Sequence, residues 1–225
     1  MDEKRRLLIE NADARAIAPE KLVTMAKLFV VISEWVIAND IDTTAIQCWT
    51  SLQENLGINV CSIMSVMSGQ LMPSACEVDV MGALSMYALA SCSLSPASLA
   101  DWNNNFGDER DKCVLFHCGN FASASLESPT MGTADIIGTT VGKENTCGAV
   151  HGRMKQGDLT YFRLSTDDFS GEIKAYVGEG MSVTDPLDTV GCRAVIQVPQ
   201  LETLLAWICR TCFSLIVSMN QLATS

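Results

Sequence analysis

The chain has 225 residues, of which 48% are hydrophobic and 18% charged, a composition typical of a packed globular protein and not of a disordered one. Its formal net charge of −11 argues against nucleic acid as a partner, because phosphate binding depends on clustered Lys and Arg. The most apolar stretches, 22–37 and 201–219, are interrupted by charged residues, so neither is predicted to span a membrane.

The ten cysteines bear on the compartment of the protein. The first residues, MDEKRRLLIENADAR, are charged and contain no hydrophobic export signal. We therefore expect a cytoplasmic protein with free thiols. Cys209 and Cys212 form one CxxC, and no second CxxC completes a zinc-binding set, so a structural zinc site is the less favoured interpretation.

Helical and strand-like patterns alternate through the first half of the chain. Pro19 opens a helical pattern that is apolar on more than one face, and Thr50 and Ser51 are suited to cap a later helix. The alternation predicts an α/β unit with a parallel sheet. The expected elements are a helix over 19–37, a strand over 41–49, helices over 52–56 and 60–68, and a buried strand or strand-loop over 72–80.

The second half has a different texture, with frequent glycines from Gly132 onward and short β-like runs. This pattern predicts an antiparallel β region that resembles a small barrel. We therefore expect a partial α/β domain over 1–125 and a β-rich, barrel-like domain over 126–225. The elements expected here are a helix over 82–90, a Ser/Pro linker over 93–98, strands over 113–117, 160–164, 173–177 and 193–198, and a closing helix from 201.

Two acids in the stretch 74–105 are candidates for a functional site. Glu77 lies in a short apolar run, and Asp101 opens a polar cluster after a Ser/Pro break. An acid in an apolar setting is costly to ionise unless a cation, a hydrogen-bond donor or a proton compensates it. At successive strand ends, two carboxylates could share a divalent cation and exchange protons with a substrate. Spacing alone favours the alternative, in which Glu77 pairs with a Lys or Arg and Asp101 caps a helix that begins at Trp102.

The chain has two histidines, and both are considered as site residues. His117 ends an apolar strand and could serve as a metal ligand or proton donor, although a satisfied core histidine fits the pattern equally well. His151 lies beside the basic residues Arg153 and Lys155, where a role in a turn is the preferred interpretation.

Five segments carry a family resemblance: CEVDVMGALSMYALA, DWNNN, DKCVLFHCGN, VHGRMKQGDLTYFRLSTDD and DPLDTVGCRAVIQVP. Together, and in this order, they resemble the C-terminal half of the L-fucose/L-arabinose isomerase family, in its fucose isomerase-like branch. The resemblance covers residues 21–220 and implies a sugar ketol-isomerase that interconverts aldoses and ketoses through an ene-diol. It also implies a divalent metal, typically Mn²⁺, and a small-molecule sugar as substrate.

The resemblance assigns roles to particular residues. It implies that Glu77 and Asp101 are paired catalytic carboxylates that also bind the metal, and that His117 is a further metal ligand. Hydrogen transfer between C1 and C2 requires removal of a weakly acidic C–H proton, which one carboxylate would take and the other return. A metal that holds the neighbouring oxygens would stabilise the developing ene-diolate. The implied substrate-binding residues are Trp102, Asn103 and Asn104.

Two departures from the family pattern lead to an alternative. Family members carry a histidine near the C-terminus that completes the metal shell, whereas the matching stretch here, Cys212 to Ile216, contains none. The α/β domains that precede this region in the family are expected to be absent. We therefore expect a homo-oligomer, or a separate chain that supplies those domains. The alternative function is a catalytically inactive, truncated family member that acts as a binding or assembly protein. A third hypothesis is a gene-fragment product whose exposed apolar surfaces, such as the helix over 22–37, drive self-association.

Overall fold

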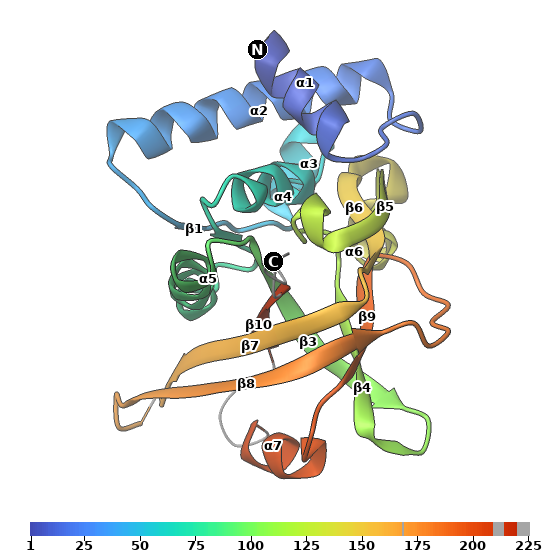
Figure 1. Ribbon diagram of the computed structural model, residues 1–225. Coiled ribbons are helices and arrows are strands. Elements are labelled where there is room, and N and C mark those ends of the chain that lie inside the picture. Colours follow the sequence, from blue (N-terminus) through green and yellow to red (C-terminus); the bar gives the residue numbers. More distant parts are fainter. Residues whose placement is uncertain (168, 209–213, 220–225) are drawn as a thin grey trace, which may run out of the picture.

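The computed structural model describes residues 1–167, 169–208 and 214–219. Helices from the first part of the chain form a layer above a large mixed sheet (Figure 1). The elements of the helical part are α1 (Asp2–Asn11), α2 (Pro19–Ala38), β1 (Thr44–Ala45), α3 (Ser51–Leu56), α4 (Cys61–Gly69), β2 (Ser74–Ala75) and α5 (Val80–Ser93). Those of the sheet part are β3 (Ala97–Phe106), β4 (Glu109–His117), β5 (Leu126–Thr133), α6 (Asp135–Val141), β6 (Cys147–Met154), β7 (Gly157–Thr166), β8 (Ile173–Val183), β9 (Cys192–Gln197), α7 (Leu201–Ile208) and β10 (Ser214–Met219).

The predicted helices of the first half are confirmed, whereas its two strands are much shorter than expected. Strands over 41–49 and 72–80 were expected, but only β1 and β2 form, as a parallel pair with Thr44 opposite Ser74. The second segment leaves the extended conformation at Glu77 and Val78, which have positive φ of 61° and 57°. Extended strands have negative φ, so the chain turns there instead of continuing the sheet.

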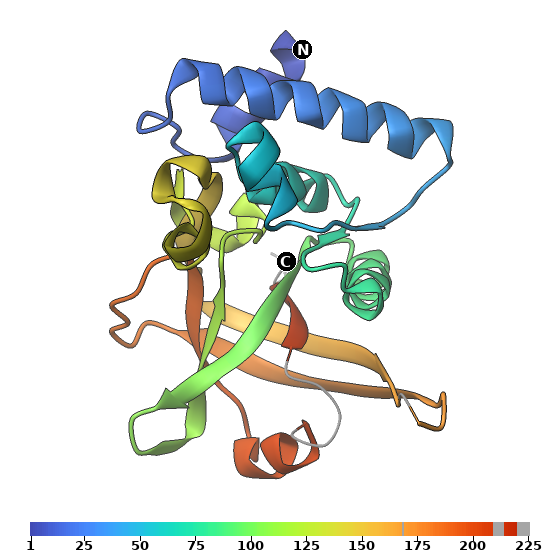
Figure 2. The ribbon, with the colours of Figure 1, turned by 180° about the vertical axis from the view of Figure 1, so that it is seen from behind.

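The large sheet contains eight strands in the order β4-β3-β10-β7-β8-β9-β6-β5. β4 also pairs with β9, so the pairings among β4, β3, β10, β7, β8 and β9 form a closed cycle. Seven of the eight neighbouring pairings are antiparallel, and β6 runs parallel to β9. The mixed α/β class is thus confirmed. Figure 2 shows the β3–β4 hairpin extending away from the helical layer.

Strand β3 occupies the place where the sequence predicted a Ser/Pro linker and a polar cluster. It begins at Ala97 and pairs on both sides, with β4 and with β10. The linker over 93–98 is therefore wrong for its last two residues. The division of the chain at 125 stays a prediction, and β3 and β4, which precede it, are hydrogen-bonded to strands that follow it.

The end of the chain differs from the predicted closing helix. α7 ends at Ile208, and 214–219 form β10, which lies between β3 and β7. A closing helix beyond 208 is therefore wrong for these six residues. The physical reason is tertiary, because β10 satisfies the backbone groups of two strands whose facing edges would otherwise lack partners. Cys209 and Cys212, the CxxC pair, lie outside the described residues.

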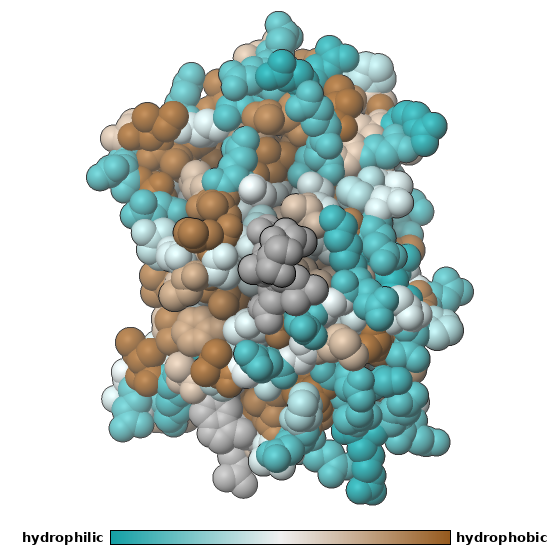
Figure 3. All heavy atoms as spheres, viewed as in Figure 1, coloured by the Kyte–Doolittle hydropathy of each residue, from teal (hydrophilic) through white to brown (hydrophobic). Residues whose placement is uncertain are grey.

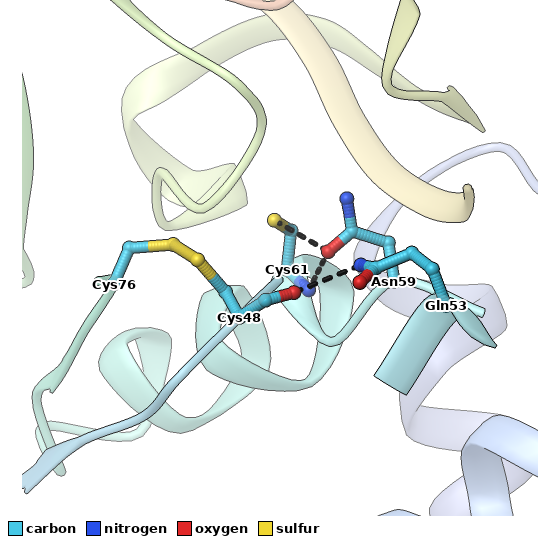
Figure 4. The surroundings of a disulfide bond; sticks show 5 residues. All are labelled: Cys48, Gln53, Asn59, Cys61 and Cys76. Atoms are coloured by element: carbon cyan, nitrogen blue, oxygen red, sulfur yellow. Dashed lines mark hydrogen bonds between the residues drawn. A yellow bond between two sulfur atoms is a disulfide. The ribbon is translucent and has the colours of Figure 1, made fainter. Parts of the chain in front are cut away.

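The expectation that the thiols are free is wrong for two of them. Cys48 and Cys76 form a disulfide that joins the segments following β1 and β2, and Figure 4 shows its surroundings. Neither spacing nor an export signal pointed to this pair, because it depends on the parallel pairing of two short strands. The free cysteines among the described residues are Cys61, Cys92, Cys113, Cys118, Cys147 and Cys192.

The core lies between the helices and the sheet. α4 is buried from Cys61 to Ser68, and the largest fully buried side chains include Phe29 of α2 and Phe121 of the β4–β5 connection. This burial explains why α4 carries no charged side chain, and its three serines are buried as well. One of them, Ser65, donates to the backbone oxygen of Phe121 at 2.6 Å. None of the described helices is long and apolar enough to cross a membrane.

Candidate functional site

Glu77 lies in the loop between β2 and α5, in a sterically unfavourable backbone conformation. Its φ is positive, as is that of the β-branched Val78, and both side chains are exposed. Backbone hydrogen bonds from Val78 N–H to Ile46 O at 3.3 Å and from Asp79 N–H to Cys76 O at 3.1 Å hold the loop. Non-glycine residues in this region cost of order 1 kcal/mol and cluster at functional sites, so the loop identifies Glu77 as a candidate.

Asp79 is fully compensated by neighbouring groups, and sequence reasoning did not assign it a role. Its Oδ1 accepts from the Gly82 N–H at 2.7 Å, which caps α5. Arg163 of β7 donates from Nη1 to Oδ2 at 2.5 Å and from Nη2 to Oδ1 at 2.9 Å. A Cβ on Gly82 would lie 2.5 Å from Asp79 Oδ2, so the pair requires glycine there. An Asp three residues before a glycine at a helix start is the signal that could have revealed this cap.

Asp101 lies within β3, opposite Phe116 of β4, so the alternative in which it caps a helix is wrong. Burial raises the pKa of Asp101 to about 6, with further contributions from the negative charges of Glu77 and Asp79, while Arg163 acts in the opposite direction. The contribution of Glu77 to the pKa of Asp101 shows that the fold brings the two predicted acids within electrostatic reach. Neither Glu77 nor Asp101 has a hydrogen-bond or ion-pair partner for its carboxylate among the described residues.

His117 is fully buried at the end of β4, where its register partner is Cys192 of β9. Burial lowers its pKa to about 4, although the charge of Asp79 acts to raise it. The imidazole is therefore neutral near pH 7. Its Nδ1 is buried without a hydrogen-bond partner among the described residues, so this atom is free to accept or donate a bond.

A cavity of about 250 Å³ lies beside Glu77 and His117. Asp101 is not among the described residues that line it. Cys118 lies on its wall, and burial followed by the charges of Glu77 and Asp101 raises the pKa of this thiol to about 11. Cys118, which sequence reasoning did not select, thus lies close to both acids. The lining residues are Cys48, Trp49, Cys61, Cys76, Glu77, His117, Cys118, Ile136, Ile137, Thr139 and Thr140.

The predicted sugar-binding residues follow Asp101 along β3. Trp102 Nε1 donates to the hydroxyl of Tyr176 at 3.2 Å, and its ring meets Tyr161 edge-on with centroids 6.0 Å apart. Asn103 and Asn104 are exposed. In the structure Trp102 therefore packs against β7 and β8, and the sugar-binding role of all three residues stays a prediction.

The donor chemistry of the acids suits a hard divalent cation, because carboxylate oxygens are the ligands that such ions prefer. Among the described residues, however, no three His, Cys, Asp or Glu side chains are arranged to hold a metal ion. The structure therefore does not bring Glu77, Asp101 and His117 together into a three-ligand group, and their role as metal ligands stays a prediction.

The sequence of the chain is similar to that of known sugar isomerases. Residues 115–219 match the protein-family model described as L-fucose isomerase, C-terminal domain. The match begins after Glu77 and Asp101 and includes His117. The predicted resemblance to the L-fucose isomerase family is thus confirmed.

The curated relatives that match are named sulfoquinovose isomerase. One, from Priestia aryabhattai, is 24% identical over 201 residues, which is 87% of this chain and 44% of the relative. A second, from Alkalicoccus urumqiensis, is 26% identical over 186 residues, covering 80% of this chain and 39% of the relative. The chain therefore spans less than half the length of these relatives, and the first alignment is long enough to include both Glu77 and Asp101.

Proposed function

We propose that this protein is a sugar ketol-isomerase in which Glu77 and Asp101 exchange the proton between C1 and C2 of the substrate. The observation that carries the proposal is the convergence of two acids from different elements, neither of which forms an ion pair among the described residues. The neighbouring Asp79 is neutralised by Arg163, so the region is not simply an exposed acidic surface. The similarity to sugar isomerases supplies the reaction class.

The surroundings of Asp101 and Glu77 suit them to different steps of the proton transfer. A carboxylate whose pKa is raised is a stronger base, and Asp101, at about 6, is suited to take the C–H proton near neutral pH. Glu77 lies on the cavity wall, where in its carboxylic acid form it would donate its own proton to the neighbouring carbon. Proton exchange with solvent would then return Asp101 to the carboxylate and Glu77 to the acid. The apolar side chains of Ile136 and Ile137 line the same cavity and would limit the access of water to the ene-diol.

We further propose that a divalent cation such as Mn²⁺ assists the reaction, with Glu77 and Asp101 supplying two of its ligands. Such an ion, when bound, stabilises negative charge on neighbouring sugar oxygens. The remaining ligands would come from His117, from groups outside the described residues, from a second copy of the chain in a homo-oligomer or from a separate chain. The closed cycle of six strands would form a barrel-like unit, although it includes β3 and β4, which lie outside the predicted range of 126–225.

The substrate class proposed from the relatives is a hexose that bears a sulfonate, as sulfoquinovose does. A second candidate function, assembly without catalysis, is favoured by the exposed apolar side chains of α2. Val31, Trp35 and Ile37 are 61%, 56% and 80% exposed. Hydrophobic surface gathers over this end of α2 in Figure 3. Patches of this kind mark association surfaces.

Sugar isomerisation assayed with added Mn²⁺ tests the proposal. We expect turnover in the parent chain and a fall of about 100- to 10,000-fold in Glu77→Gln and in Asp101→Asn, the range for loss of a general acid–base group. Glu34→Gln, which removes an exposed acid of α2, is the matched control and should retain full activity. Absence of metal-dependent turnover in the parent, with self-association in sedimentation experiments, would favour the assembly function instead.

A further inference from the structure

A tryptophan for which the sequence predicts no role lines the cavity beside Glu77. Trp49 lies between β1 and α3, and its side chain is 44% exposed. It shares the wall of the cavity, whose volume is about 250 Å³, with Glu77 and His117. Pockets for drug-sized ligands have volumes of about 300–1,000 Å³, so this cavity suits a ligand as small as a single sugar ring.

The disulfide brings Trp49 close to Glu77. Each of these two residues directly follows one of the bonded cysteines, Cys48 and Cys76, whose Cα atoms lie 5.8 Å apart. Gln53 of α3 donates from Nε2 to the backbone oxygen of Cys48 at 2.8 Å, which holds the same segment from its other side (Figure 4). Two residues far apart in the chain are therefore held at one cavity.

Trp49 and Trp102 differ in how the fold uses their rings. Trp102 packs against the core, and its Nε1 donates to Tyr176. Trp49 is not one of the apolar side chains that pack against the core, and among the described residues no aromatic ring stacks against it. Exposure alone is common for large apolar side chains, so the informative feature is the place of Trp49 on the wall of the cavity that contains Glu77.

The other lining residues give the cavity an apolar side and a polar side. Ile136 of α6 lines it and is 58% exposed, so it adds to the apolar surface of Trp49. Glu77, Thr139 and Thr140 carry oxygen atoms and line the same space. A sugar has the matching division, with carbon-bound hydrogens on one face and hydroxyl groups around its edge. The negative face of an aromatic ring attracts such polarised hydrogens.

We propose that the sugar ring lies on the indole of Trp49 while its C1–C2 unit faces Glu77. The proposal rests on the proposed function and adds a substrate-binding residue to it. It assigns to Trp49 the sugar-packing role that the resemblance implies for Trp102. Stacking of this kind is made equally in the bound substrate and in the transition state, so it contributes to affinity and not to the chemical step.

Fluorescence titration and calorimetry test the contact without requiring turnover. L-Fucose and sulfoquinovose serve as probes, and we expect at least one of them to bind the parent chain and to change its tryptophan emission. Trp49→Ala should weaken this binding about 10-fold and remove most of the emission change. Trp49→Phe keeps an aromatic face, so it should retain most of the affinity without the emission change. Trp35→Ala, at a 56% exposed indole of α2, is the matched control and should alter neither.

Each outcome bears on the proposal. In an active parent, Trp49→Ala should raise KM about 10-fold with little change in kcat, the sign of lost uniform binding. Trp49→Phe guards against misfolding of the Ala variant. Equal affinities in parent and Trp49→Ala would overturn the contact, as would failure of the parent to bind either sugar, or a loss of binding in Trp102→Phe that Trp49→Ala does not show. Binding that depends on Trp49 without any turnover would uphold the contact and reject the isomerase function.

Discussion

Three acids lie in one small region of the fold, and they differ in whether a cation pairs with them. Among the described residues, Asp79 has such a partner, whereas Glu77 and Asp101 do not. Asp79 caps α5 and forms a two-bond ion pair with Arg163, whose side chain is only 7% exposed. The other two carboxylates have no such partner among the described residues, and the charge of Glu77 helps to raise the pKa of Asp101. We infer that Asp79 stabilises the packing of α5 against β7, whereas the carboxylates of Glu77 and Asp101 remain available for chemistry.

The largest effect that would test this contrast is on stability. Asp79→Ala should lower the free energy of unfolding by about 3–5 kcal/mol, because it removes the helix cap and leaves Arg163 buried without its partner. Asp101→Asn should cost little, since it removes a like-charge repulsion with Glu77. Urea denaturation measures the free energy of unfolding of both variants. Equal decreases in the two variants would show that Asp101 also stabilises the fold.

Removal of the disulfide next to Glu77 tests whether this bond stabilises the loop that carries the candidate site. Cys48→Ser should lower stability by about 3 kcal/mol in oxidising buffer, because the bond closes a loop with a sequence separation of 28 residues. The same variant should match the parent once both are reduced with dithiothreitol. Cys92→Ser, at an exposed free cysteine, is the control for losing a thiol. A Cys48→Ser protein as stable as the parent in oxidising buffer would mean that the bond does not stabilise this loop.

Gly82 offers a way to disturb Asp79 without changing any charge. Gly82→Ala should cost about 1–3 kcal/mol, because the new methyl would overlap Asp79 Oδ2 and lie 2.8 Å from Arg163 Nη1. Gly69→Ala, at the last residue of α4, has nothing within 4 Å of the added carbon and should be neutral or stabilising by up to about 1 kcal/mol. Thermal melting monitored by circular dichroism measures both, and a stabilised Gly82→Ala would contradict the close approach.

The smallest expected effect concerns Trp102, which the structure ties to the sheet. Tyr176→Phe removes the acceptor of the Trp102 Nε1 hydrogen bond and should cost about 1–2 kcal/mol, because the indole N–H loses its partner in a half-buried position. Tyr87→Phe, at a 39% exposed ring, should cost less than half as much. An unchanged stability in Tyr176→Phe, with altered sugar binding, would instead favour the predicted contact of Trp102 with substrate.

The helices were the most predictable part of the fold, and the long strands were predicted only in part. α2 follows from its apolar pattern and from Pro19 at its start, and α5 from a continuous run of apolar and small residues, all of which are local features of the sequence. β3 was missed because its polar stretch Asn103 to Asn105 lies on an exposed hairpin arm that resembles a loop in composition. β10 was missed because apolar residues continue from α7 across 201–219, so composition does not distinguish a strand from a continuing helix there.

For the candidate site, the sequence by itself selected Glu77, Asp101 and His117, since acids and histidine at the ends of apolar segments are unusual and family motifs surround them. Only the tertiary structure decided that Asp79, not Glu77, takes the arginine, that Cys48 bonds to Cys76, and that Arg153 lies beside Arg193. Each of these pairs joins residues far apart in the chain. Their contacts depend on strand register and on which elements pack together, and neither is encoded in the local pattern of residues.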